Sequence, residues 1–107
     1  MATPDNQNRF RSTIFYALSD PLRLEIIAYL RDGEKCVCEI VPPLELIQPL
    51  VSRHLKILKA TGLVKCRKEG TKRMYSIADQ RIFEMLDALT SELIKTLAKE
   101  AFKSTFC

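Results

Sequence analysis

Apolar residues recur at helical spacing in several parts of the chain, which predicts a mainly helical protein. A first helix is expected from about Arg9 to Leu18. A second follows in the stretch SDPLRLEIIAYLRDG, because Asp20 is a good N-cap, Pro21 suits the first helical turn and Gly33 suits the far end. The next stretch, CVCEIVPPLEL, is less regular. Its two adjacent prolines remove backbone donors, so any helix there must be short, distorted or restarted.

The stretch QPLVSRHLKILKATGLV predicts a helix that ends at Gly62 and has two different faces. Its apolar side chains and His54 gather on one side of a helical wheel, which we expect to pack. The opposite side is hydroxyl and cationic, and consists of Ser52, Arg53, Lys56 and Lys59. Such a face can meet phosphates and base edges in the major groove of DNA.

Two strand-like runs, Leu63–Arg67 and Arg73–Ile77, flank a turn that contains Gly70 and predict a β-hairpin. From Asp79 to about Ala101 the apolar residues keep a helical stripe, which predicts one helix of roughly 35 Å. A helix of that length exceeds what so small a domain can cover by itself. We therefore expect a partner, most simply an identical subunit, to bury the excess.

Positive charge is concentrated in the same region. The 17 Lys and Arg outnumber the 13 Asp and Glu, which gives a net charge of only +4. Between Arg53 and Arg73, however, basic residues stand against the single acid Glu69. We interpret this stretch as an electrostatic footprint for nucleic acid, the alternative being an ordinary solvated face. The hairpin tip, with Lys68, Lys72 and Arg73, should give a second contact to the DNA backbone.

The length of 107 residues and the 47% of apolar residues fit one domain. We expect residues 1–8 to be disordered, 9–101 to form the domain and 102–107 to be a flexible tail. The N-terminal stretch MATPDNQNRF is polar and no apolar run is long enough to span a membrane, so we expect a cytoplasmic protein. Thiols are normally kept reduced there, so the four cysteines should be ligands, sensors or packing residues.

The predicted order of elements, a short helix, a turn, a basic helix and a basic hairpin, is that of a winged helix-turn-helix. The stretches SDPLRLEIIAYLRDGE, CVCEI, QPLVSRHLKILKATGLV and KEGTKRMYSI, in this order, resemble the ArsR/SmtB family of metalloregulatory repressors. The resemblance implies the element order α-α-α-α-β-β-α and a homodimer formed through the first and last helices. It also implies a repressor that releases operator DNA when it binds a toxic metal or metalloid. By position, it implies recognition-helix contacts at Gln48, Ser52 and Arg53, and a wing at the hairpin.

Several positions depart from the family's pattern. Ile47 stands where a capping Ser is usual, and Glu45 stands in a turn that often holds Gly. The fullest arsenic-sensing pattern has a third thiol where this chain has Val41. Residues 79–81, Asp-Gln-Arg, stand where the Asp-x-His ligands of zinc-sensing members would begin.

Cys36 and Cys38 are the candidate metal ligands. Side chains two residues apart point about 200° apart in an ideal helix, so both can hold one ion only if the backbone is unwound. Lys35 and a nearby helix N-terminus would favour thiolates. These soft ligands suit As(III) or Sb(III) first and cadmium or lead next. Three-thiolate coordination of As(III) needs another sulfur, for which Cys66, Cys107 or an exogenous thiol are the candidates.

We expect the cysteine pair to lie away from the basic face and to act allosterically, without blocking DNA. One alternative keeps the DNA-binding fold but makes the pair a redox switch, because a Cys-x-Cys disulfide would be labile. Another is a DNA-binding module whose cysteines are inert. An enzyme is disfavoured, because the sequence has no acid pair, no phosphate loop and no base beside the thiols.

Overall fold

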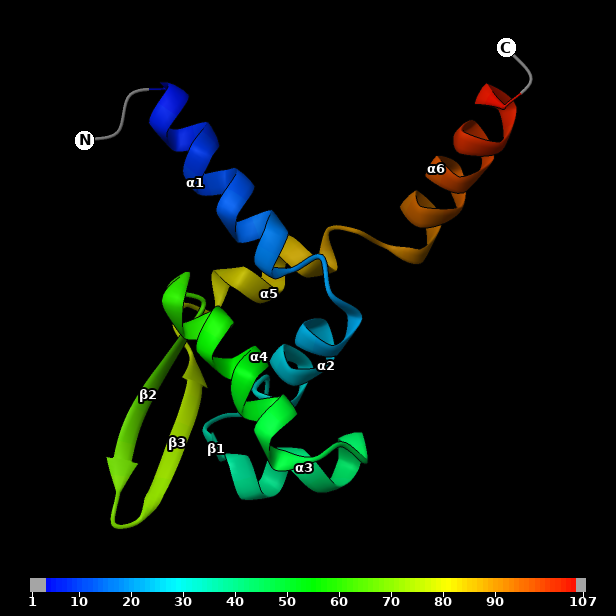
Figure 1. Ribbon diagram of the computed structural model, residues 1–107. Coiled ribbons are helices and arrows are strands. Elements are labelled where there is room, and N and C mark those ends of the chain that lie inside the picture. Colours follow the sequence, from blue (N-terminus) through cyan, green and yellow to red (C-terminus); the bar gives the residue numbers. More distant parts are fainter. Residues whose placement is uncertain (1–3, 106–107) are drawn as a thin grey trace.

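The computed structural model describes residues 4–105, which fold as a winged helix-turn-helix with two projecting helices (Figure 1). The expected mainly helical fold with a small hairpin is confirmed. The helices are α1 (Pro4–Ala17), α2 (Pro21–Tyr29), α3 (Val37–Leu44), α4 (Gln48–Ala60), α5 (Arg81–Asp87) and α6 (Ser91–Ser104). The strands are β1 (Lys35–Cys36), β2 (Val64–Glu69) and β3 (Lys72–Ile77). Helices α3 and α4 are the helix-turn-helix, and β2 and β3 are the wing.

Local sequence signals account for most element ends. The carboxylate of Asp20 accepts a hydrogen bond of 2.8 Å from the Leu22 N–H and caps α2, as expected. Helix α3 is short, and ends where Glu45 takes a left-handed conformation with φ of 54°. The cap of α4, Ile47, makes no side-chain hydrogen bond, in line with the expected weaker cap. Gly62, with φ of 83°, follows the end of α4, where a side chain would be strained.

The three strands form an antiparallel sheet in the order β1-β3-β2. Gly70 and Thr71 form the turn of the wing, closed by the pair Glu69 and Lys72. Strand β1 was not predicted, because two residues are too few for an alternating pattern. It places Cys36 opposite Met74 of β3.

The core lies among α2, α3, α4 and the base of the wing. Its fully buried large side chains are Ile26, Ile27, Leu30, Ile40, Val51, Leu55 and Leu58. The predicted packing face of α4 is confirmed, and includes the buried His54. The Arg23 guanidinium from α2 reaches His54 Nδ1 at 3.3 Å and donates to the Ala17 carbonyl oxygen at 2.6 Å. These bonds satisfy the polar groups that burial takes from water.

The prediction of one long C-terminal helix is wrong. Helix α5 ends at Asp87, and α6 begins at Ser91. Between them Thr90 has an extended backbone, and its hydroxyl accepts a hydrogen bond of 3.2 Å from the Leu93 N–H. The apolar stripe continues through this break, so periodicity alone did not reveal the N-cap.

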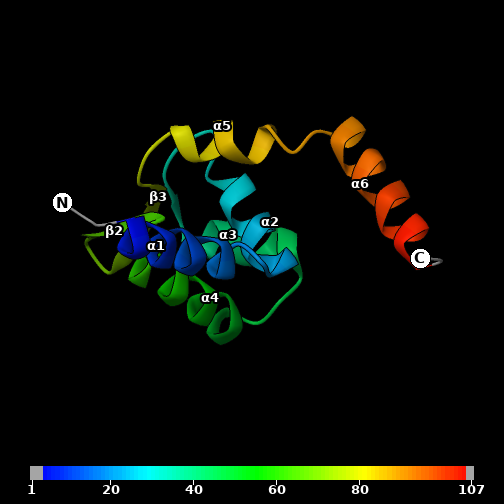
Figure 2. The same ribbon diagram turned by 90° about the horizontal axis from the view of Figure 1, so that it is seen from above.

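The chain termini also differ from expectation where the structure describes them. Residues 4–8, expected to be disordered, belong to α1, and α6 continues to Ser104. Helices α1 and α6 project from the body in different directions (Figures 1 and 2). The radius of gyration is 16.4 Å, against about 13 Å for a compact domain of this size. Helix α6 has no buried side chain. Both arms thus lie largely outside the core of this chain.

Candidate nucleic-acid interface and thiol site

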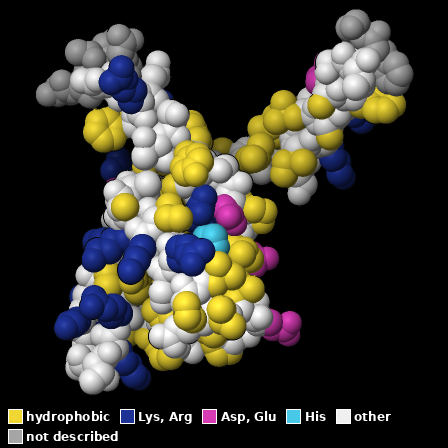
Figure 3. Space-filling model, viewed as in Figure 1, with side chains coloured by type: hydrophobic (Ala, Val, Ile, Leu, Met, Phe, Trp, Pro, Cys, Tyr) yellow, Lys and Arg dark blue, Asp and Glu magenta, His cyan; other side chains and the backbone are white. Residues whose placement is uncertain are grey.

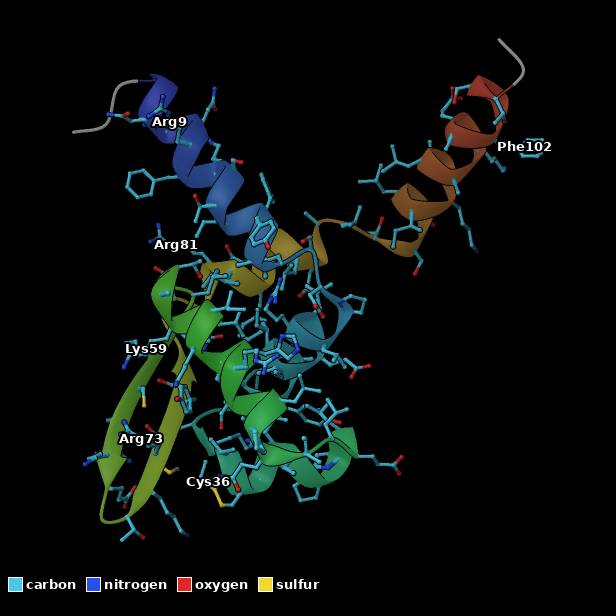
Figure 4. The ribbon with its side chains drawn as sticks, viewed as in Figure 1. Arg9, Cys36, Lys59, Arg73, Arg81 and Phe102 are labelled. Carbon is cyan, nitrogen blue, oxygen red and sulfur yellow. A yellow bond between two sulfur atoms is a disulfide. The ribbon has the colours of Figure 1, made fainter. Side chains whose placement is uncertain are left out.

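An open groove of about 640 Å³ runs between α4, the start of α3 and the wing. Its lining residues are Cys36, Val37, Cys38, Gln48, Ser52, Lys56, Lys59, Thr71, Lys72, Arg73 and Tyr75. Figure 4 shows Arg73 on the wing, Lys59 near the end of α4 and Cys36 at the start of α3. The groove thus brings the recognition helix, the wing and the thiol pair to one surface.

Most of the predicted DNA contacts meet in this groove. Helix α4 contributes Gln48, Ser52, Lys56 and Lys59, which recur at helical spacing opposite its buried face. The wing adds Lys72 and Arg73. Two further predicted contacts are exposed but lie outside the groove lining: these are Arg53 on α4 and Lys68 on β2. Thr71 and Tyr75 also line the groove, but the sequence did not indicate them, because only the folded hairpin brings them to this surface.

The basic side chains gather over α4 and the wing, on the left of the view in Figure 3. Arg67 of β2 belongs to the basic stretch of the sequence, but acidic side chains bind its guanidinium. Its guanidinium binds both Glu34, at 2.6 Å, and Glu69, at 2.9 Å. The hydrogen bond with Arg67 holds the pKa of the Glu34 carboxyl below its usual range. The positive charge of Arg67 is therefore balanced locally by two carboxylates.

Cys36 and Cys38 lie at the junction of β1 and α3. Cys36 is the N-cap of α3 and has an extended backbone, so the unwinding that the sequence required occurs at this residue. Its N–H donates a hydrogen bond of 3.0 Å to Glu39 Oε1, which fixes the first turn. The two sulfur atoms are joined in a disulfide, with the Cα atoms 5.2 Å apart. Cys36 is only 3% exposed, whereas Cys38 is exposed.

The structure does not bring Cys66 to this pair. Cys66 is opposite Tyr75 in the sheet, and Cys36 is opposite Met74, so the two cysteines alternate to opposite faces. Cys66 packs against the core. Burial, and then the hydrogen bond with Cys66, raise the pKa of Tyr75 above its usual range. These contacts favour a packing role for Cys66.

Only after its disulfide is reduced would the cysteine pair offer two thiolate donors for a soft ion. Cys107 lies outside the described residues, and within residues 4–105 no group of three or more His, Cys, Asp or Glu side chains is placed to hold a metal ion. The described residues therefore supply no third protein donor beside the two sulfurs of this pair.

The expectation that the cysteine pair lies away from the basic face is wrong. Both residues line the groove together with Ser52, Lys56 and Lys72. The physical reason is the pairing of β1 with β3, which docks the start of α3 against the wing. In the sequence, Cys36 and Lys72 are far apart, and nothing local indicates this contact.

The groove, the helix-turn-helix and the wing define a DNA-binding transcriptional regulator. Residues 20–65 match the family described as "Bacterial regulatory protein, arsR family". The chain is 49% identical over 74 residues to an HTH-type transcriptional regulator of Methanocaldococcus jannaschii. The matched region covers 68% of this chain and 83% of that protein. The chain belongs to the ArsR family, whose members are transcriptional regulators and not enzymes.

Further relatives carry more specific names. Identity is 42% over 82 residues to the arsenical resistance operon repressor of Staphylococcus xylosus, covering 77% of this chain and 75% of that protein. It is 45% over 74 residues to the HTH-type transcriptional repressor SmtB of Mycobacterium tuberculosis, covering 68% of this chain but only 55% of that one.

Solved structures agree with the fold. Reduced HlyU from Vibrio cholerae superposes with a TM-score of 0.72 at 30% identity, covering 81% of this chain and 95% of that one. A homodimeric winged helix-turn-helix DNA-binding domain from Mycobacterium bovis gives a TM-score of 0.70 at 28% identity, covering 92% and 86%. Within residues 4–105, no helix combines the length and apolar character needed to cross a bilayer.

Proposed function

We propose that the protein is a homodimeric, sequence-specific repressor that releases operator DNA when a thiophilic metal or metalloid binds Cys36 and Cys38. The expected inducers are arsenite or antimonite first, and cadmium or lead next. The observation that carries the proposal is the groove that joins the thiol pair to the recognition helix and the wing. The names of the relatives, which include an arsenical resistance operon repressor, support the same function.

In this proposal the DNA duplex lies along α4 and the wing. Gln48 and Ser52, near the start of α4, carry the amide and hydroxyl groups that read base edges. The cations that line the groove hold the phosphate backbone; these are Lys56, Lys59, Lys72 and Arg73. Arg53 and Lys68 extend the contact on either side of the groove.

The dimer forms through α1 and the α5–α6 region. Exposed apolar side chains on α1 include Phe10, Phe15 and Tyr16. Helix α6 exposes Leu93, Ile94 and Leu97, which recur at helical spacing. Isolated helices of this length are marginal in water, so both arms need a second surface to be stable. An identical chain supplies two further copies of the same arms, as in the homodimeric relative from Mycobacterium bovis.

Reduction of the disulfide gives two neighbouring thiols, and a soft ion bound there would take the place of the sulfur–sulfur bond. As(III) supplies two bonds to these sulfurs and keeps one position for a further donor. That donor is an exogenous thiol, Cys107, or a group from the second subunit. Cys36 is the N-cap of α3, so the bound ion would lie at the first turn of the helix-turn-helix and beside the groove.

The test follows operator binding while the reduced dimer is titrated with As(III), Cd(II) or Zn(II). Release by As(III) and Cd(II), with stoichiometric loss of two reactive thiols per chain, is the expected result. A Cys36→Ser, Cys38→Ser variant should hold the operator and ignore both ions, and Cys66→Ser is the matched control that should respond normally. Release of the double variant by As(III) would contradict the assignment.

A second candidate function is redox sensing, which is favoured by the disulfide between Cys36 and Cys38. One molecule of hydrogen peroxide would form this bond from the two thiols: it takes up their two electrons and two protons and is reduced to two molecules of water. The discriminating experiment treats the metal-free, reduced protein with peroxide and follows both its mass and its operator affinity. Release accompanied by a loss of two mass units, and reversed by a dithiol, would favour this function over ion binding.

A further inference from the structure

We infer that DNA and any group bound at the cysteine pair occupy the same groove and exclude one another directly. This inference rests on the proposed function, and specifies how the thiol site controls DNA binding. In this view the operator is released because the bound group competes with DNA for one surface, and not because a conformational change passes through the fold. The occupant that competes with the thiol ligand is the phosphate backbone of the operator.

The first support is position. Cys36 and Cys38 line the groove together with α4 residues and with the wing residues Thr71, Lys72 and Arg73. A DNA strand held by both the recognition helix and the wing must pass between them, because these two elements form the walls. Cys36, the first residue of the pair, lies where the start of α3 meets the wing (Figure 4).

The second support is charge complementarity. Four cationic side chains line the groove, whereas no carboxylate does, so the groove fits a polyanion. Glu39 and Glu69 line a separate hollow of about 410 Å³, which meets the groove only at Cys36, Thr71 and Lys72. The cysteine pair therefore borders a cationic groove, in which we place the phosphate backbone of the DNA.

The third support is unequal access to the two sulfurs. Cys38 is exposed, whereas Cys36 is almost fully buried. An atom bound to Cys38 consequently adds bulk on the open side of the pair. A metalloid with two sulfur ligands also needs room for its third donor, and the groove beside Cys38 offers such room.

A metal-free experiment tests the competition. A chain with Cys36, Cys66 and Cys107 replaced by Ser retains Cys38 as its only thiol, and its alkylation by iodoacetamide is timed with and without saturating operator DNA. We expect DNA to slow alkylation at least tenfold. The matched control adds Glu25→Cys and Cys38→Ser to the same background, which places one exposed thiol on α2, away from the groove. Its alkylation rate should not change.

Equal rates at Cys38 with and without DNA would overturn the inference, and so would equal protection of the α2 thiol. The reciprocal measurement compares operator affinity before and after alkylation of Cys38, with helix content and dimer mass checked in both states. Direct exclusion predicts that alkylation lowers operator affinity at least tenfold. The loss should be larger for the negatively charged carboxymethyl adduct, made with iodoacetate, than for the neutral adduct, made with iodoacetamide. Unchanged affinity would contradict it. Neither measurement uses a metal, so a failed ion response would count against the proposed function alone.

Discussion

Arg23 of α2 and His54 of α4 meet in the core, with Arg23 Nη1 3.3 Å from His54 Nδ1. Both side chains are buried, and the same guanidinium also donates to the Ala17 carbonyl oxygen at the end of α1. One arginine thus connects the recognition helix with the helix that supports it and with the first arm. The contact leaves the polar face of α4 directed outward, toward the groove.

Replacing His54 by Ala should destabilise the fold. The change leaves a buried guanidinium nitrogen without its acceptor and opens a small cavity, at a cost of about 1–3 kcal/mol. Urea unfolding followed by circular dichroism measures this loss. His54→Gln, which retains an acceptor, should recover a large part of it. Equal stability of the Ala variant and the wild type would show that the contact contributes nothing.

A charge on the apolar face of α6 should separate the dimer. Leu93→Glu places a carboxylate among the apolar side chains proposed to pack against the second subunit, so sedimentation should report monomer and operator binding should weaken. Lys95→Glu introduces the same group on the opposite side of α6 and is the control, which should remain dimeric. A monomeric wild type at micromolar concentration would contradict the proposed assembly.

Two basic residues should affect DNA binding in different ways. Lys72→Ala removes a phosphate contact, so it should weaken binding to all sequences and lower the slope of log K against log salt by about one. Arg53→Ala should relax sequence preference, with a loss of about 1–3 kcal/mol if Arg53 reads a base. Titrations of operator and scrambled duplexes at several salt concentrations separate the two effects. Wild-type binding by both variants would show that the DNA face is wrongly assigned.

Removing the partner of Arg67 should strengthen non-specific binding. Glu34→Gln leaves only Glu69 to balance the guanidinium of Arg67, which belongs to β2 of the wing. The expected result is tighter binding to a scrambled duplex at low salt and a steeper salt dependence. Arg67→Gln in the same background should reverse the gain. A gain that persists in the double variant would place the effect elsewhere.

Much of the fold could be predicted from the sequence, because strong local signals were present. The cap and proline at the start of α2, the two-faced pattern of α4 and the turn glycine of the wing each have a local physical cause. The break at Thr90 could not be predicted from periodicity, because the apolar stripe continues on both sides of it.

Most residues of the candidate site could be predicted from the sequence, but their arrangement could not. The basic face of α4 and the thiol pair are each visible in a short stretch. Their meeting depends on β1, whose two residues pair with β3 across more than thirty intervening positions. The separation of Cys66 from Cys36 depends on the register of the same sheet. No window of sequence contains that information.

In the proposed dimer, the projecting arms make assembly part of folding. A chain whose terminal helices leave most of their apolar side chains exposed until a second chain arrives has a thermal midpoint that rises with protein concentration, by mass action. Below the dissociation constant of the dimer, the arms would lose their support and the two reading heads would no longer be held at a fixed spacing. The number of copies in the cell would then set a threshold for repression, independently of any inducer.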